Sequence, residues 1–244
     1  MAATKVSLIT TVLPSIFYED PEPVEDGMQQ ATVVVEIAHM LTAHFRDEPE
    51  VFVSAGGFIF YDPSNGNRRI APDIYIERDV DVAGIYENLP NYWIWEIGKA
   101  PDFVLEVASP STASNDLGHK RDQYARLGIA EYWRLDPTGG DLYGQPLAGE
   151  RLVDGEYQPY ELHADADGTI WAYSEVLGLR FHWGLELIEG FDVRDPETGR
   201  TISIAEVERE ARLAEREARL AAEAREQALL AEIERLRRSH PADD

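Results

Sequence analysis

The chain has 244 residues, of which 44% are apolar and 28% are charged, and this composition indicates a folded protein rather than a disordered one. It contains no cysteine, which excludes disulfides, cysteine-ligated metal centres and thiol catalysis. Acidic residues outnumber basic ones by 46 to 22, and the net charge of −24 repels a polyphosphate backbone. Any activity on nucleic acid therefore requires a local basic surface, divalent cations or a basic partner.

The amino end, residues 1–17, carries one lysine and a short apolar stretch that Thr10, Thr11 and Pro14 interrupt. No cleavage site of small residues follows, so we expect this segment to belong to the domain and the protein to be cytoplasmic. No apolar run reaches the roughly 18 residues of a membrane-spanning helix, and we expect no contact with a membrane. Residues 18–27 are acidic and proline-rich and predict a loop.

An amphipathic helix is predicted over residues 28–46, because apolar side chains recur there at helical spacing. Residues 51–67 predict two short strands around a pair of glycines, followed by a turn. Residues 71–79 predict a further strand, with Ile74 and Ile76 on one face and Asp73 and Tyr75 on the other.

The middle of the chain predicts a strand, a helix and a second strand. Residues 101–110 contain a nearly continuous apolar run, typical of a strand that is buried on both faces. Residues 111–129 begin with helix-capping residues and end at Gly128, which predicts a helix. Residues 131–137 predict the second strand. This order predicts an α/β core in which at least some strands pair in parallel.

The composition of the chain changes twice in its last part. Residues 138–200 are rich in turn dipeptides and predict a peripheral antiparallel extension packed on the core. Residues 202–238 lack glycine and proline and predict a helix about 50 Å long with an alanine-rich seam. We expect this helix to be a coiled-coil arm that forms homo-oligomers, although a solvated single helix held by Glu–Arg pairs is the alternative. The chain is thus divided into residues 1–200 and residues 201–244.

Carboxylates gather in the predicted strands. Two strands begin with Pro–Asp, at Asp73 and Asp102, and the second continues to Glu106, while the next helix carries Asp116 and Lys120. Strand-borne carboxylates near a lysine can hold a divalent metal and activate water for phosphodiester hydrolysis. Asp102 and Glu106 lie roughly 13 Å apart along one strand, too far to share an ion. Asp73 and Glu106 can converge if their strands are neighbours, and Lys120 can reach back over the end of the Glu106 strand.

Each of these residues also has a structural interpretation. Asp73 can cap a strand or turn, and Lys120 can pair with Asp116 on the helix surface. A structural role is favoured for Asp102 and, as a residue of the first helical turn, for Asp116. Glu106 is harder to explain in this way, because an unpaired carboxylate in so apolar a strand is costly to bury.

The stretch PDFVLEVASPSTASNDLGHKRDQYARLGIAEYWRLDP resembles the signature of the Uma-two family, whose members are similar to restriction endonucleases of the PD-(D/E)XK nuclease superfamily. Upstream, RRIAPDIYI resembles the family's R-x-PD strand, and the similarity covers about residues 28–190. The resemblance implies a restriction-endonuclease-like α/β fold, with a mixed sheet core flanked by helices. The β extension and the long C-terminal helix add to it here.

The resemblance also implies roles for particular residues. Asp73 takes the place of the family's metal-binding aspartate, and Glu106 takes the (D/E) position. Where the usual lysine follows two residues later, this chain has Ala108, so Lys120 on the next helix would replace it. Lys120 would then position or help deprotonate the attacking water, or stabilise charge on the phosphate. The implied cofactor is Mg²⁺ or Mn²⁺, and Glu36 on the first helix is a further candidate ligand.

The implied activity is that of a metal-dependent endonuclease that hydrolyses DNA phosphodiester bonds through an Asp/Glu/Lys site. The net charge of −24 favours an alternative, a catalytically silent or partner-dependent oligomeric interaction protein built on a nuclease fold. A third hypothesis is an RNA or nucleotide phosphodiesterase that uses the same site, since a fold does not determine its substrate.

Overall fold

The computed structural model describes residues 28–89, 91–184 and 190–239. The predictions made for residues 1–27 lie outside this part of the chain. Within it, no helix combines the length and the apolar character needed to cross a membrane.

A six-stranded mixed sheet forms the centre of the molecule, with the strand order β1-β4-β6-β7-β8-β9. The pair β6 and β7 is parallel, and the other neighbouring pairs are antiparallel. Both strands of the parallel pair are largely buried, as expected for the middle of a covered sheet. The strands are β1 (Phe52–Ala55), β4 (Ile74–Glu77), β6 (Phe103–Val107), β7 (Glu131–Leu135), β8 (Leu147–Val153) and β9 (Glu156–Pro159).

Two smaller sheets accompany the central one. An antiparallel five-stranded sheet consists of β10 (His163–Ala164), β11 (Ile170–Ser174), β12 (Leu179–Trp183), β13 (Phe191–Arg194) and β14 (Thr201–Ile202). A three-stranded sheet has the order β3-β2-β5, and its strands are β2 (Ile59–Phe60), β3 (Arg69–Ile70) and β5 (Tyr92–Trp93).

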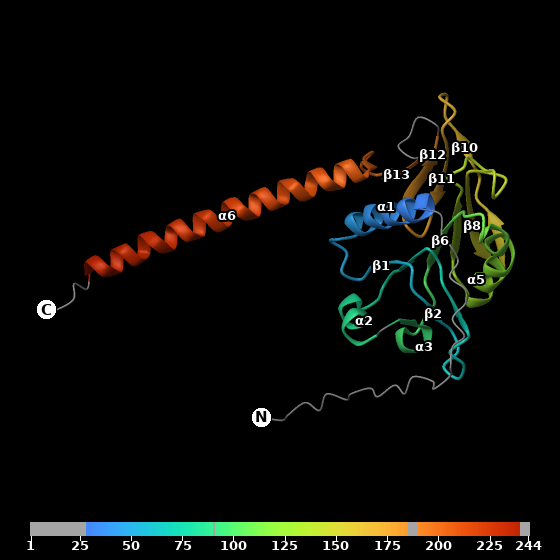
Figure 1. The fold of residues 1–244 in the computed structure, drawn as a ribbon, viewed down its shortest axis with the longest axis horizontal. Helices are drawn as coiled ribbons and strands as arrows, with labels where there is room; N and C mark the ends of the chain where they lie inside the picture. Colours follow the sequence, from blue (N-terminus) through green and yellow to red (C-terminus); the bar gives the residue numbers. More distant parts are fainter. Residues whose placement is uncertain (1–27, 90, 185–189, 240–244) are drawn as a thin grey trace.

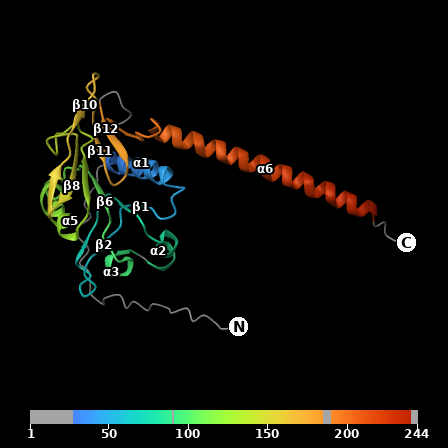
Figure 2. The same cartoon turned by 180° about the vertical axis from the view of Figure 1, so that it is seen from behind.

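Helices cover both faces of the central sheet. In Figures 1 and 2, α1 lies on one side of the strands and α5 on the other. Short helices join the strands at the end of the molecule where β2 lies (Figure 1). The helices are α1 (Met28–His44), α2 (Val82–Asn88), α3 (Ile94–Ile97), α4 (Ala113–Asn115), the π-helical turn η1 (Asp116–Lys120), α5 (Arg121–Leu127) and α6 (Ile204–Ser239).

The core has two main parts, one on each face of the central sheet. On the α1 face, Ile74 and Ile76 of β4 pack with Leu41 of α1 and with side chains of the five-stranded sheet such as Phe181. On the other face, Tyr75 packs among residues of the three-stranded sheet, α5 and β7. The predicted alternation of Ile74 and Ile76 against Tyr75 is therefore confirmed.

The antiparallel extension is more integral to the fold than its sequence suggests. Its first strands, β8 and β9, continue the central sheet. Its later strands bring Ala172, Phe181 and Val193 into the same apolar cluster as α1. The segment therefore closes one side of the core instead of lying at its periphery.

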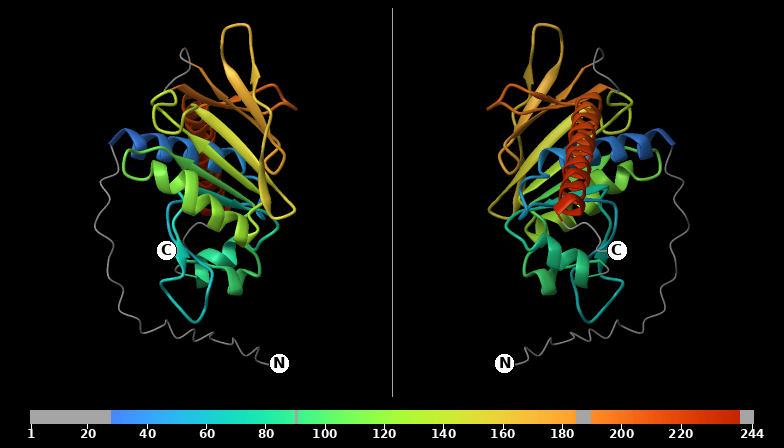
Figure 3. Two further views of the ribbon diagram at one scale, coloured as in Figure 1. Left: turned by 90° about the vertical axis from the view of Figure 1, so that its right-hand side faces the viewer. Right: turned by 90° about the vertical axis from the view of Figure 1, so that its left-hand side faces the viewer.

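The predicted C-terminal helix is present as α6, which runs away from the rest of the molecule (Figures 1 and 2). The two views in Figure 3 look nearly along this helix from opposite sides and show the sheets at its N-terminal end. Val207, in its first turns, is buried against the core, whereas several large apolar side chains further along are exposed. These are Leu213, Leu220, Leu229, Leu230 and Ile233.

Candidate active site

The central sheet brings Asp73 and Glu106 together. Strands β4 and β6 are antiparallel neighbours in which Ile74 is paired with Leu105. The same register places Asp73 opposite Glu106, one position further along each strand. The backbone N–H of Asp73 donates to Oε2 of Glu106 over 3.4 Å, and the N–H of Val107 donates to Oδ2 of Asp73 over 2.8 Å. The two predicted carboxylates therefore meet at one end of the sheet.

Lys120 reaches this pair from the segment that follows β6. Its Nζ lies 2.9 Å from Oε2 of Glu106 and 3.0 Å from Oδ1 of Asp116. Asp116 and Lys120 are the first and last residues of η1, and a single π-helical turn of this kind often occurs at functional sites. The predicted approach of Lys120 to the end of the Glu106 strand thus occurs in the structure.

A buried chain of hydrogen bonds holds Asp116 in place behind the lysine. The hydroxyl of Tyr143 donates to Oδ2 of Asp116 over 2.7 Å. Tyr143 is itself fixed, because its N–H donates to the buried carboxylate of Asp136, which also accepts from Leu142 and Thr138. Asp116 therefore does more than cap a helical turn, since it connects Lys120 to the loop after β7.

Two further residues contact the carboxylate pair. Nε2 of Gln30, near the start of α1, donates to the carbonyl of Val107 over 2.9 Å and approaches Oδ2 of Asp73 at 3.4 Å. The hydroxyl of Tyr124 on α5 donates to Oε1 of Glu106. Tyr124 lies one helical turn after Lys120, within the stretch that resembles the family signature, whereas Gln30 reaches the site only through the packing of α1 against the sheet.

Burial dominates the electrostatics of the pair. It raises the pKa of Glu106 to about 8, against the opposing influence of Lys120, and it also raises the pKa of Asp73 above its ordinary value. For Lys120, burial lowers the pKa, but the carboxylates of Glu106 and Asp116 outweigh it and hold the pKa above the ordinary value. Lys120 therefore stays protonated, while burial disfavours the ionised forms of Glu106 and Asp73.

A divalent cation fits this charge distribution. When ionised, the three carboxylates and one ammonium sum to a charge of −2, which one Mg²⁺ or Mn²⁺ would cancel. The carboxylate oxygens of Asp73 and Glu106 are hard ligands, and Mg²⁺ is commonly held by one or two carboxylates together with water and substrate phosphates. Among the described residues, no three His, Cys, Asp or Glu side chains gather closely enough to hold a metal by themselves.

Glu36, the other candidate ligand, also lies on α1 and stays a prediction. It lies six residues after Gln30 on α1 and roughly 120° around the helix from it. The hydrogen bonds and ion pairs given above for Asp73 and Glu106 do not involve Glu36. Gln30 of α1 contacts Asp73 and the carbonyl of Val107.

A second cluster of the same residue types lies at the opposite end of β4 and β6. Lys99 pairs there with the buried Glu77 and, at 2.9 Å, with Asp102. Asp102 also accepts the N–H of Arg78 over 3.0 Å, and Tyr92 donates to Glu77 over 2.8 Å. These bonds tie strand ends together, in agreement with the structural role predicted for Asp102.

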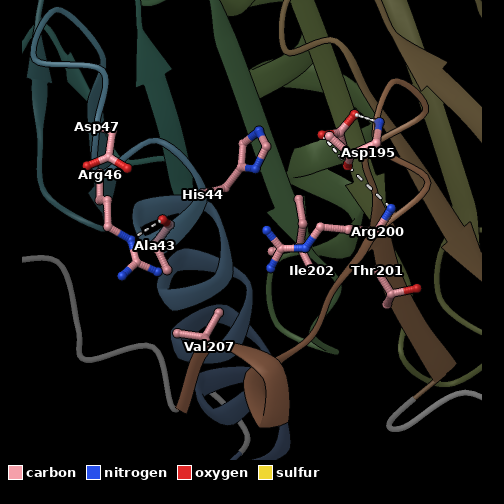
Figure 4. Close-up of a pocket in the computed structure, with 10 residues that line it drawn as sticks. Ala43, His44, Arg46, Asp47, Asp195, Arg200, Thr201, Ile202 and Val207 are labelled. Atoms are coloured by element: carbon pink, nitrogen blue, oxygen red, sulfur yellow. Dashed lines mark hydrogen bonds between the residues drawn. The ribbon is translucent and has the colours of Figure 1, made fainter. Parts of the chain in front are cut away.

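A polar cavity of about 360 Å³ lies at the other end of α1 (Figure 4). The C-terminal turn of α1 and the β13–β14 turn line it with His44, Arg46 and Asp195, and Arg46 donates to the carbonyl of Ala43. His44 lies fourteen residues from Gln30 and so about 21 Å along the helix. This cavity is separate from the carboxylate pair and lies where α6 joins the body.

The fold indicates the class of protein. The mixed sheet flanked by helices matches a restriction-endonuclease-like fold, and it carries two carboxylates on adjacent strands with a lysine beside them. Residues 21–184 match the model of the Uma2 family, which is described as "Putative restriction endonuclease". The chain belongs to this family.

A protein from Anabaena variabilis, whose crystal structure is described as that of a putative nuclease belonging to DUF820, is 13% identical to this chain. The similarity covers 64% of this chain and 76% of the other, with a TM-score of 0.44. A search of curated proteins finds no match.

Proposed function

We propose that the protein is a metal-dependent endonuclease that hydrolyses phosphodiester bonds of DNA at Asp73, Glu106 and Lys120. The observation that carries this proposal is the contact between Lys120 and Glu106, at 2.9 Å, on the strand next to Asp73. Membership of a restriction-endonuclease-like family supports the same reaction class.

In this proposal Asp73 and Glu106 hold Mg²⁺ or Mn²⁺. The bound ion would supply Lewis-acid activation of a scissile phosphate and of water. The residues of the chain prepare the site for it. Tyr124 and Lys120 orient the Glu106 carboxylate from two sides, and Gln30 orients the carbonyl of Val107 beside it. Lys120, held by Asp116, presents a fixed positive charge where negative charge develops on the phosphate.

Cleavage of supercoiled plasmid DNA tests the proposal. We expect nicking with Mg²⁺ or Mn²⁺ and none with EDTA. Glu106→Gln should abolish nicking, and Lys120→Ala should slow it by about 10²- to 10³-fold, the usual effect of removing one group that stabilises a transition state. Cutting of RNA in preference to DNA would redirect the proposal to a ribonuclease.

The second carboxylate cluster provides the matched control. Asp102→Asn removes a carboxylate from a similar Lys/Asp/Glu group on the same two strands, at the far end of the sheet. We expect this variant to nick DNA at the wild-type rate. Metal-independent nicking, or equal loss in Asp102→Asn and Glu106→Gln, would contradict the assignment of the site.

We further propose that α6 joins copies of the chain into a homo-oligomer. Apolar side chains of α6 such as Leu213, Leu220 and Leu230 are exposed along a helix that leaves the body. Exposed leucines along a helix are typical of a surface that a partner helix covers. In this arrangement residues 1–200 form the nuclease domain and residues 201–244 the assembly segment.

A further inference from the structure

Gln30 brings an amide group from α1 to the candidate active site. The residue is 6% exposed, and its Nε2 donates to the carbonyl of Val107 over 2.9 Å. A carbonyl oxygen only accepts hydrogen bonds, so this contact determines which end of the amide is the nitrogen and which is the oxygen. The same Nε2 lies 3.4 Å from Oδ2 of Asp73, a long distance for a hydrogen bond. The amide is therefore held beside Asp73 in a defined orientation.

The oxygen of this amide, Oε1, is buried and has no hydrogen-bond partner among the described residues. Buried side-chain oxygens in folded proteins nearly always have a partner. Oδ1 of Asp116 lacks a hydrogen bond as well, but it faces the ammonium of Lys120 at 3.0 Å. Oε1 of Gln30 is thus an acceptor at the site that the described residues leave without a donor.

The groups that contact Gln30 are themselves acceptors, namely the carboxylate of Asp73 and the carbonyl of Val107. The N–H of Val107 already donates to Asp73. Amide oxygens bind hard cations such as Mg²⁺ and Mn²⁺ together with carboxylates and water. Among the described residues, no three His, Cys, Asp or Glu side chains can hold a metal by themselves. A neutral amide oxygen would add a third ligand to the two carboxylates.

We propose that Oε1 of Gln30 is a third protein ligand of the divalent cation held by Asp73 and Glu106. The inference rests on the proposed function, to whose metal site it adds a ligand. Gln30 is neutral, so one divalent ion still balances the charge of −2 at the site. The three ligands come from α1, from the residue before β4 and from β6. Binding of the ion would therefore also tie α1 to the central sheet.

Calorimetric titration of the full chain with Mn²⁺, without DNA, tests the inference independently of cleavage. Gln30→Met keeps the length of the side chain but has no amide oxygen, and it should raise Kd at least about tenfold, as is usual when a residue around a metal is changed. Gln30→Glu keeps an oxygen but loses the N–H that the carbonyl of Val107 accepts, and its Kd should equal or fall below that of the wild type. If Gln30 only held Val107 in place, both variants would lose affinity equally, and this result would overturn the inference.

The number of water molecules on the bound ion gives a second measurement. Coordination positions that the protein does not fill are occupied by water. Gln30→Met should therefore add one water to the bound Mn²⁺, counted from the line broadening that isotopically labelled water causes in the EPR spectrum. An equal number of waters in Gln30→Met and in the wild type would overturn the ligand role.

Gln158→Met is the matched control, because Gln158 is an exposed glutamine on β9, at the edge of the central sheet. Its Kd for Mn²⁺ should stay within twofold of the wild type. All variants are compared by circular dichroism and thermal melting, so that a loss of fold is not mistaken for a loss of ligand. An equal loss of affinity in Gln158→Met and Gln30→Met would contradict the inference.

Plasmid cleavage measured in parallel separates this inference from the proposed function. Mn²⁺ binding and nicking that both need Asp73 and Glu106 but not Gln30 would overturn the ligand role and leave the nuclease in place. The expected order of affinities in the Gln30 variants, without any cleavage by the wild type, would support the ligand role and contradict the nuclease. A wild type that does not bind Mn²⁺ would overturn the inference.

Discussion

Three carboxylates share one ammonium at the candidate site, and this excess of negative charge has a measurable consequence for Glu106. Burial raises its pKa from an ordinary 4.5 to about 8, so between these pH values the folded chain binds more protons than the unfolded chain. We expect the free energy of unfolding of the metal-free protein to fall as pH rises through this window. Urea denaturation in EDTA at pH 5 and pH 8.5 measures the fall.

Glu106→Gln is the comparison for this prediction. The variant cannot titrate at this position, so its stability should depend less on pH than that of the wild type. The histidines whose pKa burial lowers, His44 and His182, are present in both proteins and cancel in the comparison. Parallel pH curves for the two proteins would show that Glu106 keeps its ordinary pKa.

A second prediction concerns the hydrogen bond between Tyr143 and Asp116. Tyr143→Phe removes the hydroxyl that holds Oδ2 of Asp116 and leaves the ring in place. Lys120 would then be held less firmly, and misplacement of a catalytic group lowers turnover steeply. We expect nicking to slow by about 10- to 100-fold with no change in the Kd for DNA. Tyr173→Phe, which changes an exposed hydroxyl on β11, should have no effect.

Part of this site could be predicted from the sequence. Strand alternation placed Asp73 and Glu106 on faces that can meet, and the helix after β6 placed Lys120 within reach. Gln30 and Tyr143 could not be predicted, because their hydrogen bonds depend on how α1 and the loop after β7 fold back onto the sheet. Contacts between segments far apart in the chain leave no local pattern.

Among the elements, β7 and β11 are joined by a buried carboxylate. Glu131 accepts hydrogen bonds from Trp133, Tyr160, Ser174 and the N–H of Val176, at 2.6 to 2.9 Å. Glu131→Gln would turn an amide toward these donors and leave some of them unpaired. We expect a loss of about 3 kcal/mol in the free energy of unfolding, measured with urea.

The neighbouring Glu175 is the control for this prediction. It forms an exposed ion pair with Arg151 at 3.2 Å, and exposed pairs contribute about 1 kcal/mol or less. Glu175→Gln should therefore change the stability little. Equal, small changes in both variants would mean that Glu131 does not hold the two sheets together.

The elements themselves follow closely from local patterns. The spacing of apolar residues and the positions of glycines predicted α1, β4, β6, β7 and the helical segment between β6 and β7. Strands β6 and β7 pair in parallel, as the order of the predicted elements implied. The five-stranded sheet was expected at the periphery, yet Phe181 and Val193 lie in the main core. Strand lengths and turn residues do not reveal that these side chains are in the main core, because their burial depends on which face of the central sheet the five-stranded sheet covers.

For the whole molecule, we expect α6 to determine the state of assembly in solution. Deletion of residues 211–244 keeps the buried Val207 but removes the exposed leucines. We expect sedimentation to find an oligomer for the full chain and a monomer for the shortened one. The melting temperature at high dilution should change by only a few degrees, because the deleted part contributes little to the core. A monomeric full chain would contradict the proposed role of α6.

The central claim is that Asp73 and Glu106 form a divalent-metal site, and calorimetric titration with Mn²⁺ tests it most directly. We expect one ion per wild-type chain, binding abolished by Asp73→Asn and by Glu106→Gln, and binding retained in Asp102→Asn, whose carboxylate lies in the second cluster. Affinity should rise with pH toward 8, because the ion competes with protons for Glu106. Equal affinity in the wild type and in both site variants, or no binding by the wild type, would contradict the claim.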